Sequence, residues 1–470
     1  MTVLSCLSKS ICRPYIMSDP IYDVVIIGGG VCGTGLLYTL SNYTNVKHIA
    51  LIEKESDVAL VNSYTNSNSQ TLHFGDIETN YTLAKATKVN AGATLVKNYL
   101  LTQDTQQEIY TKYHKMVLGV GKSQIDKLKT RYREFKQLFP DLKLLNRAEI
   151  AAKEPKILES RDESEDIIAL FTSEGYTIDF HCLARSFLAK SVNRSDKNIE
   201  LLFDTKVRKI TKEQEIYKIR IGDRNIAAKA VAVAAGAHSL LFAKSLSYGL
   251  NYALLSVAGS FYFAPQLLNG KVYTVQRQKL PFAAIHGDPE VRDSAIARFG
   301  PTAKVLPMLE RHNYASIIEY FQTAGLSGKA IASFIKILAD PIIFRYIALN
   351  FIYDFPIIGK RLFIKEVKKI IPSIKLNNLT YARGYGGVRP QIVNLNTKAL
   401  EMGEAKIVGD KIIFNITPSP GASTCLQNAL EDTERIINFL GNDYQFDRSK
   451  FMGDLSDDRT QQERQEISST

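Results

Sequence analysis

Three glycines, Gly28, Gly30 and Gly33, follow the apolar run 24–27 in G-x-G-x-x-G spacing. In this pattern the first glycine permits a tight turn, the second lets a pyrophosphate approach the backbone, and the third lets a helix pack closely on a strand. The N-terminus of the following helix offers free N–H groups and a positive dipole to phosphates. Glu53 lies about twenty residues downstream, where an acid accepts hydrogen bonds from a ribose diol. These residues predict a dinucleotide site.

The elements needed to position this motif occur in the right order. The β-branched run 24–27 predicts a strand that is buried on both faces. Residues 34–40 carry apolar side chains at helical spacing, and 49–52 form a second strand that ends at Glu53. A lone G-x-G-x-x-G is a weak signal, because glycine-rich turns are common. The complete strand–turn–helix–strand context favours the dinucleotide site over a simple turn.

A polar loop over 61–80 leaves the second strand. In a dinucleotide fold such a loop returns to the cofactor at the carboxyl ends of the strands. We therefore expect Ser69, Gln70 and His73 to lie beside a bound flavin ring. A solvated surface loop is the alternative interpretation.

Three further glycine-containing segments are candidates for cofactor contacts. The predicted strand 226–235 ends at Gly236, as in the second cofactor contact of many flavoproteins, although an ordinary strand–turn has the same pattern. Gly387 lies in the glycine-rich segment 381–391, where the absence of side chains lets the backbone approach a flavin or substrate. Gly421 precedes a predicted helix at 426–440, whose N-terminus would point at the flavin.

Composition limits the possible classes of protein. A chain of 470 residues exceeds one compact core, so we expect two or more lobes. The content of hydrophobic residues (45%) and charged residues (23%) is that of an ordinary globular protein. Five cysteines show neither C-x-x-C pairs nor histidines at metal-ligand spacing. This pattern argues against zinc, iron–sulfur clusters and a disulfide framework, and it favours a reducing compartment.

The chain is basic, and the excess charge is concentrated in one segment. The net charge is +11, and residues 301–375 contain eleven Lys and Arg but five Asp and Glu. Such a charge suits nucleic acid or an anionic membrane, but no nucleic-acid-binding motif is legible. The longest apolar stretch, 331–355, is interrupted by charges, so no transmembrane helix is predicted. We interpret 302–375 as amphipathic membrane-docking helices, with a solvated helical subdomain as the alternative.

The rest of the chain divides by pattern. Residues 82–150 have mostly helical periodicity, and residues 254–289 alternate like a separate antiparallel sheet. Residues 1–18 are basic, rich in serine and acid-free, which suits either a short mitochondrial presequence or a disordered leader. A polar disordered tail is expected over 446–470. The predicted FAD-binding domain comprises 19–90, 175–250 and 376–445, and the predicted substrate domain comprises 91–174 and 251–375.

Seven motifs distributed along the chain resemble the FAD-dependent malate:quinone oxidoreductases. The likeness extends from about Tyr22 to Leu440, with the motifs in the expected order: YDVVIIGGGVCGTGLLYTLS, NSQTLHFGDIETNYT, VAVAAGAHS, KLPFAAIHGDPEV, ARFGPTA, GYGGVRPQ and PSPGASTCL. The resemblance implies an α/β fold like that of D-amino-acid oxidase, the glutathione-reductase-2 type. Such a fold has a discontinuous Rossmann-like FAD domain and a substrate domain on a mixed or antiparallel sheet with helices.

The resemblance also implies the reaction. It implies oxidation of (S)-malate to oxaloacetate on FAD, with transfer of both electrons to a membrane quinone, which links the citric acid cycle to respiration. The implied location is peripheral, on the mitochondrial inner membrane if the leader is genuine, or on the cytoplasmic face of a bacterial membrane if it is not. No metal and no nucleic acid are expected.

The chemistry of alcohol oxidation identifies candidate catalytic residues. A secondary alcohol needs a base for its hydroxyl proton and an acceptor for its hydride, which a flavin supplies. His286, between an apolar strand and a glycine turn, is the candidate base. Arg298 and Arg389 are candidates for binding the two carboxylates, with Arg383 in reserve. His73 and Gln70 are expected to complete the substrate pocket.

Three other functions remain open from the sequence. The first is an L-2-hydroxyglutarate or other 2-hydroxyacid flavin dehydrogenase or oxidase. The second is an RNA-modifying flavoprotein, which only the charge of +11 suggests. The third is a binding module that holds a dinucleotide without turnover.

Overall fold

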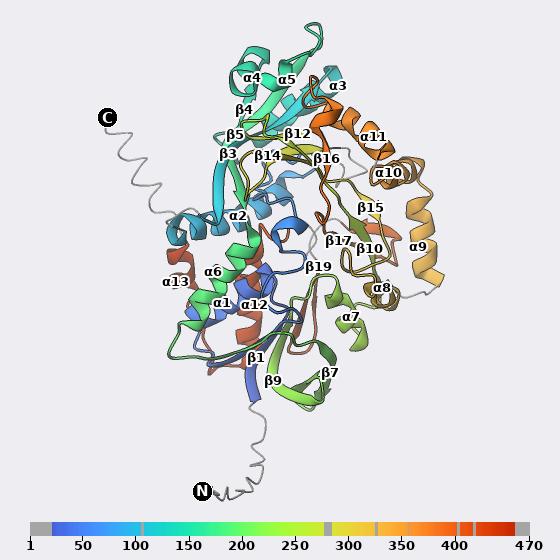
Figure 1. The fold of residues 1–470 in the computed structure, drawn as a ribbon. Helices are drawn as coiled ribbons and strands as arrows, with labels where there is room; N and C mark the ends of the chain where they lie inside the picture. Colours follow the sequence, from blue (N-terminus) through green and yellow to red (C-terminus); the bar gives the residue numbers. More distant parts are fainter. Residues whose placement is uncertain are drawn as a thin grey trace, which may run out of the picture.

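The computed structural model describes residues 21–104, 108–276, 284–324, 328–355, 357–401, 405–416 and 420–455. The strands of these residues form three sheets (Figure 1). The predicted leader at 1–18 and the predicted tail beyond 455 lie outside the described residues.

The first sheet carries the glycine motif. Its parallel core has the order β20-β9-β1-β2-β6, in which β1 pairs in parallel with both β2 and β9. The β-branched side chains of β1 are buried on both faces, as the sequence predicts. The parallel core strands are β1 (Ile21–Ile27), β2 (His48–Ile52), β6 (Asn198–Leu202), β9 (Arg224–Val233) and β20 (Ile412–Ile416). The flanking antiparallel strands are β7 (Val207–Glu213), β8 (Ile216–Ile221) and β19 (Ala405–Val408).

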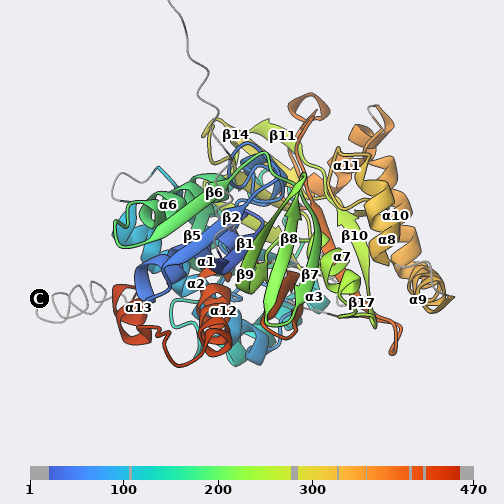
Figure 2. The same cartoon turned by 90° about the horizontal axis from the view of Figure 1, so that it is seen from below.

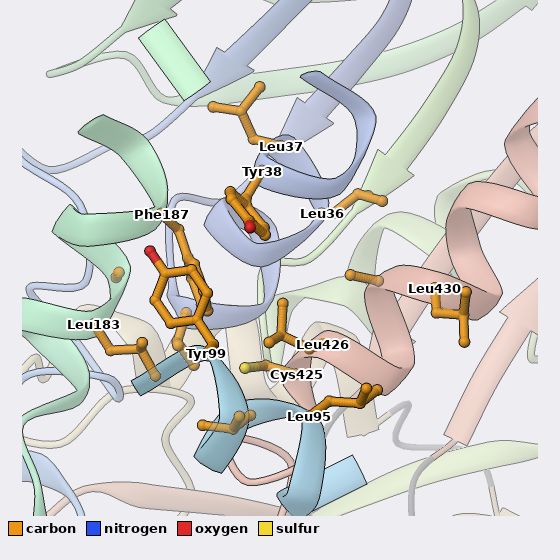
Figure 3. Packing of buried hydrophobic residues seen from close by; sticks show 14 of the residues in the cluster. Leu36, Leu37, Tyr38, Leu95, Tyr99, Leu183, Phe187, Cys425, Leu426 and Leu430 are labelled. Atoms are coloured by element: carbon orange, nitrogen blue, oxygen red, sulfur yellow. The ribbon is translucent and has the colours of Figure 1, made fainter. Parts of the chain in front are cut away.

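Helices from distant parts of the sequence pack together beside this sheet. They are α1 (Val31–Tyr43), α2 (Leu83–Gln103), α6 (Phe180–Val192) and α12 (Cys425–Leu440). Tyr38 of α1 stacks on Phe187 of α6 with ring centroids 5.4 Å apart, and Tyr99 of α2 approaches the same ring at 4.6 Å (Figure 3). Leu426 of α12 closes the cluster. A single core therefore joins segments more than three hundred residues apart, as expected for a discontinuous cofactor domain.

The second large sheet is mixed. Strands β3 and β12 pair in parallel, and the remaining pairs are antiparallel, in the order β16-β11-β14-β13-β12-β3-β5-β4. Its strands are β3 (Tyr110–Val120), β4 (Lys143–Leu145), β5 (Ile167–Ile178), β11 (Tyr262–Pro265), β12 (Lys271–Thr274), β13 (His286–Pro289), β14 (Ile296–Gly300) and β16 (Thr380–Tyr381). At the end of this sheet that lies away from the first sheet are three helices, α3 (Lys122–Phe135), α4 (Arg147–Lys153) and α5 (Pro155–Leu158) (Figure 1).

Residues 82–150 are mostly helical, as expected, but β3 interrupts them with eleven residues paired along β5. The expectation for residues 254–289 is wrong, because they do not form one separate sheet. Their first strand, β10 (Tyr252–Ala258), joins a third sheet with β15 (Lys304–Val305), β17 (Val388–Asn394) and β18 (Ala399–Glu401). The partners of these strands are distant in sequence, which local alternation does not reveal.

Four helices from the basic segment lie along one side of the molecule, the first three over the third sheet and the last against the second large sheet (Figure 2). They are α8 (Ser316–Ala324), α9 (Gly328–Leu338), α10 (Pro341–Ile352) and α11 (Ile358–Val367). No helix in the described part of the chain has the length and apolarity needed to cross a membrane. A fifth helix, α7 (His238–Ser245), packs between α8 and the first sheet.

The predicted tail begins too early. Residues 448–454 form the helix α13 (Arg448–Asp454), and its Phe451 is buried against Tyr43 of α1. The expectation of disorder from residue 446 is therefore wrong for this helix. The buried side chain of Phe451 holds this helix in place. A single aromatic residue among polar ones hardly changes the average composition of the segment, so composition did not predict the helix.

Candidate active site

The three glycines of the motif serve two different needs. Gly28 has φ +108°, and a Cβ there would lie 2.6 Å from the carbonyl oxygen of Ala234. A Cβ on Gly33 would lie 1.9 Å from the carbonyl oxygen of Gly28. Packing of the protein itself therefore requires these two glycines. A Cβ on Gly30 would meet only the hydroxyl of Ser63, at 3.4 Å, so the space beside Gly30 is open.

The open space beside Gly30 is suited to an anion. Gly30 is the N-cap of α1, with no side-chain cap and no acid in the first helical turn. The N–H of Val31 donates to Oγ of Ser63 at 3.1 Å, and the positive end of the helix dipole lies at the groove. The residues present fit the pyrophosphate of a dinucleotide.

Glu53 lies at the end of β2 and lines the same pocket. Its Oε2 accepts the N–H of Gly29 at 2.7 Å, and its Oε1 accepts the N–H of Glu55 at 3.0 Å. Burial raises the pKa of this carboxyl, because water no longer solvates the charged form. Each oxygen keeps a further lone pair for a ribose hydroxyl. Glu53 therefore both fixes the glycine loop and fits the diol of an adenosine ribose.

Most of the predicted cofactor residues line one pocket. Its walls include Gly28, Gly30, Glu53, Ser69, His73, Gly236, Arg389 and Gly421. Gly33 and Gly387 lie outside the described lining, and a Cβ on Gly387 would lie 2.3 Å from the carbonyl oxygen of Ser67. The pocket is also lined by Lys54, Asn62, Ser63, Thr71, Lys206, His238 and Glu310, which the sequence reasoning missed. Apart from His238 at the start of α7, these polar residues lie in loops with no recognisable spacing.

Arg298 joins the second large sheet to the pocket wall. Its Nη1 and Nη2 donate to the carbonyl oxygens of Asn68 and Ser69 at 3.1 and 3.0 Å. Its guanidinium carbon lies over the Phe261 ring, 5.0 Å from the ring centroid. The side chain is buried, and burial lowers the pKa of its guanidinium. Two of its nitrogens therefore hold the loop that lines the pocket, a role that its residue type alone did not indicate.

His286 lies on β13 and is not among the described lining residues, because Tyr273 lies between its ring and the lining residue Thr71. Its Nδ1 contacts the carboxylate of Asp288, and its ring stacks on Tyr273 with centroids 4.8 Å apart. The Tyr273 hydroxyl lies 3.3 Å from Oγ1 of Thr71, which lines the pocket. Burial lowers the pKa of His286 and outweighs the opposing effect of Asp288. Burial therefore favours the neutral ring, the form that a base requires.

A second histidine–carboxylate pair, His73 and Glu78, borders the pocket directly. Nδ1 of His73 lies 2.7 Å from Oε1 of Glu78, and His73 is a lining residue. Although burial opposes ionisation of Glu78, the hydrogen bond from His73 and the charges of His73 and Lys115 lower its pKa to about 2. Glu78 is thus a permanent anion that orients the His73 ring. His73 also lies close enough to His286 to lower its pKa.

The remaining predicted substrate residues occupy different environments. Gln70 is buried at φ +51°, and its amide donates to Thr65 and Glu290 and accepts from Val291, so its polar atoms hold the loop. Arg383 is exposed and lies outside the described pocket lining. Arg389 is half-buried in the pocket wall. Within the described ranges no hydrogen bond or ion pair is recorded for its guanidinium, and burial lowers its pKa.

The face of the second large sheet toward the pocket carries charges that sequence reasoning missed. Lys271 and Lys115 are buried on the adjacent strands β12 and β3, where they pair in register. Nζ of Lys115 lies 2.8 Å from Oδ1 of Asp76, and Nζ of Lys271 lies 3.6 Å from Oδ1 of Asp288. A buried lysine on a strand implies a charged partner, because an unpaired buried charge is costly. Their partners become known only from the sheet register.

Comparison with known proteins places the chain among flavoenzymes. The model of the malate:quinone oxidoreductase (Mqo) family matches residues 21–449. The probable malate:quinone oxidoreductase of Campylobacter jejuni is 42% identical, over 93% of this chain and 100% of its own. The malate:quinone oxidoreductase of Helicobacter pylori is 41% identical, over 93% of this chain and 98% of its own. L-α-glycerophosphate oxidase of Mycoplasma pneumoniae, solved with FAD bound, shares the fold with a TM-score of 0.62 at 18% identity, covering 89% of this chain and 95% of that one.

Proposed function

The chain belongs to the malate:quinone oxidoreductase family, and from this premise we propose how its residues oxidise (S)-malate to oxaloacetate on FAD for a membrane quinone. One observation supports the proposal most directly. The phosphate groove at Gly30, the acid Glu53 and the histidine–carboxylate pair of His73 belong to one continuous pocket. The family match over 21–449 favours malate over the alternative 2-hydroxyacids.

The proposed FAD site uses residues from both ends of the chain. The groove at Gly30 and the N-terminus of α1 hold the pyrophosphate, and Glu53 holds the adenosine ribose. Ser69 and the loop of Gly421 border the flavin end. When bound there, FAD supplies the acceptor for the hydride that leaves C2 of malate.

The substrate is a small dianion, so its site needs cations that are not already neutralised. Arg389 meets this requirement best, because it lines the pocket and has no recorded partner among the described residues. We propose that Arg389 binds one malate carboxylate through its planar fork. His73 contacts the other end of the substrate, while Arg298 holds the loop at Ser69 in position.

His286 is the proposed base. Burial favours its neutral form and its Nδ1 contacts Asp288, so we assign to its Nε2 the role of accepting the malate hydroxyl proton. His73 is the alternative base, because it lines the pocket and has the same arrangement with Glu78. Replacing each histidine separately by Asn decides between them, since only loss of the base should slow the hydride step.

The four helices α8–α11 form the proposed membrane-docking surface. We define it by its most exposed apolar side chains, Ile318, Ile335, Phe344 and Ile357, which are 67, 63, 63 and 69% exposed. Lysines and arginines interleave with these residues in the segment where eleven basic residues face five acids. An apolar patch of this kind suits the acyl boundary of a bilayer, and its cations suit anionic headgroups. Docking there would bring the pocket to a membrane-dissolved quinone.

We propose attachment to the mitochondrial inner membrane, with the cytoplasmic face of a bacterial membrane as the alternative. The composition of residues 1–18 supports the first location. Fusing these residues to a fluorescent protein tests it, because a diffuse signal in cells that possess mitochondria would contradict import.

One experiment tests the proposed reaction. Anaerobic mixing of the purified flavoprotein with (S)-malate should bleach the flavin, and subsequent addition of a quinone should restore its colour. 2-Hydroxyglutarate and oxygen are the comparison substrate and acceptor. A flavin that stays yellow with malate would contradict the function. A flavin reoxidised faster by oxygen than by quinone would make the protein an oxidase.

A further inference from the structure

Asp288 is a buried carboxylate that points to the proposed base. It lies two residues after His286 on β13, so both side chains project from the same face of the sheet. Its Oδ2 contacts Nδ1 of His286, and the residue is 1% exposed. In the β13–β14 register it stands opposite Arg298. A buried carboxylate is costly unless it is paired, so its position requires an explanation.

Lys271 supplies the pairing from the neighbouring strand β12. Its Nζ lies 3.6 Å from Oδ1 of Asp288 and donates to Oγ1 of Thr177 at 2.9 Å. The side chain is fully buried, so it cannot bind the substrate by itself. The three side chains therefore form a row in the order Lys271, Asp288, His286.

We propose that Asp288 and Lys271 are positioning residues for His286. The carboxylate fixes the imidazole with its proton on Nδ1 and leaves Nε2 for the malate hydroxyl. The lysine keeps the carboxylate ionised and moderates its pull on the ring. In the reaction the malate O–H bond breaks and an N–H bond forms at Nε2, so the imidazolium is stabilised by Asp288. This inference rests on the proposed role of His286 as the base.

The charges around His286 act on it in opposite directions. Asp288 on its own strand is negative and favours the protonated ring. Lys271 on β12 is a cation and disfavours it, as does His73 from the pocket loop. Arg298 on β14 acts through its attraction for Asp288, and Tyr273 stacks on the ring as a neutral phenol. Removing the carboxylate should therefore lower the pKa of His286, whereas removing the lysine should raise it.

The test uses the flavin-loaded enzyme with two readouts. The first is the anaerobic rate of flavin bleaching by malate as a function of pH. The second is the binding of succinate, a dicarboxylate without a hydroxyl, followed by the change in the flavin spectrum. A protonated His286 adds a positive charge to the site, so succinate should bind more tightly below the pKa of His286. The second readout does not depend on turnover.

Opposite shifts are the expected result. Asp288→Asn should slow bleaching at least tenfold. It should also lower the acidic midpoint of the curve of bleaching rate against pH by about one pH unit. Lys271→Met should move it up, and Asp288→Glu should restore much of the wild-type midpoint. Asp293→Asn, an exposed neighbour in the same hairpin, should change nothing. If Lys271→Met fails to hold flavin, the comparison of Asp288→Asn with Asp288→Glu decides. Unshifted midpoints, or shifts in one direction for both charges, would overturn the inference.

The outcomes separate this inference from the proposed function. A wild-type flavin that malate does not bleach would overturn the function itself. A wild-type flavin that bleaches normally, beside variants of unchanged midpoint, would overturn only the positioning role of Asp288 and Lys271.

Discussion

Arg298 donates from Nη2 to the carbonyl oxygen of Ser69 across 3.0 Å, and this bond connects the second large sheet to the wall of the cofactor pocket. A second bond to Asn68 makes the guanidinium a fork around the loop backbone. The conformation of the loop therefore depends on these two hydrogen bonds from the guanidinium of Arg298.

Replacement of Arg298 by Lys should remove the fork and leave a buried charge with poorer partners. We expect a loss of about 3 kcal/mol in the free energy of unfolding, because hydrogen bonds to charged groups are the stronger ones. Denaturant titration of the flavoprotein measures this loss. Arg292→Lys, in the same hairpin but nearly half exposed, is the control and should cost much less. Equal losses for the two variants would contradict the anchoring role.

Replacement of Gly30 by Val should give a folded but colourless protein. A Cβ at Gly30 meets only Ser63 in the protein itself, so the branched side chain mainly fills the space meant for the pyrophosphate. The ratio of flavin to protein absorbance measures retention, and far-ultraviolet circular dichroism checks folding. Gly453→Val, where a Cβ meets nothing within 4 Å, should stay yellow. A yellow Gly30→Val protein would remove the predicted phosphate site.

Replacement of His286 by Asn should retain flavin while slowing its reduction by malate about 10²–10⁴-fold, the usual contribution of a general base. His73→Asn should act mainly on the concentration of malate needed for half-maximal reduction, because His73 is proposed to contact the substrate. Stopped-flow reduction over a range of malate concentrations distinguishes the two effects. The reverse pattern would assign the base to His73 instead.

Charges introduced on the docking surface should release the protein from membranes. We expect the triple variant Ile335→Glu, Phe344→Glu and Ile357→Glu to lose most of its co-sedimentation with vesicles containing anionic lipid, while its reduction by malate is unchanged. Leu250→Glu, at a site that is 62% exposed and lies outside α8–α11, is the matched control. Undiminished pelleting of the triple variant would refute the docking proposal.

Glu319 of α8 should stabilise the protein only above acidic pH. Its carboxylate accepts from Nε2 of His238 at 2.9 Å and from Nζ of Lys206 at 2.6 Å, and these bonds lower its pKa from 4.5 to about 2. A group whose pKa falls on folding adds stability that is complete above 4.5 and is lost as the pH falls toward 2.

Glu319→Gln should therefore lower the melting temperature at pH 7, and the difference from wild type should shrink steadily below pH 4.5. Because His238 and Lys206 line the pocket, FAD should also dissociate faster from this variant at pH 7. Glu366→Gln on α11, which removes an ordinary i,i+3 pair, is the control. A difference that persists unchanged into acid would show that charge is not the cause.

Local patterns predicted the first sheet well. The run 24–27, the glycines and the apolar spacing of 34–40 are consequences of short-range geometry, and the structure confirms them as β1, the turn and α1. The basic helices are confirmed for the same reason, since a period of 3.6 residues is visible within one segment. The family resemblance then supplied the fold class.

Long-range pairing set the limit of prediction. Strand β3 escaped notice because its partners β5 and β12 come from residues about 50 and 150 positions away. Gln70 was predicted to bind the substrate, but its side-chain amide donates to Glu290 and accepts from Val291 in a hairpin that is distant in sequence. Strand alternation alone places Asp288 on the same face as His286, but Lys271 was missed because only the register of β12 and β13 places it beside them. The roles of the individual site residues stay predictions until the variants are measured.

The pocket draws its walls from residues near position 28 and from residues as late as Ser423. A nascent chain on the ribosome therefore lacks the far wall until almost the whole protein has emerged, and it cannot enclose its cofactor earlier. Cells short of riboflavin should accumulate full-length protein without bound FAD, in which the early and late walls of the pocket have assembled around an empty cavity.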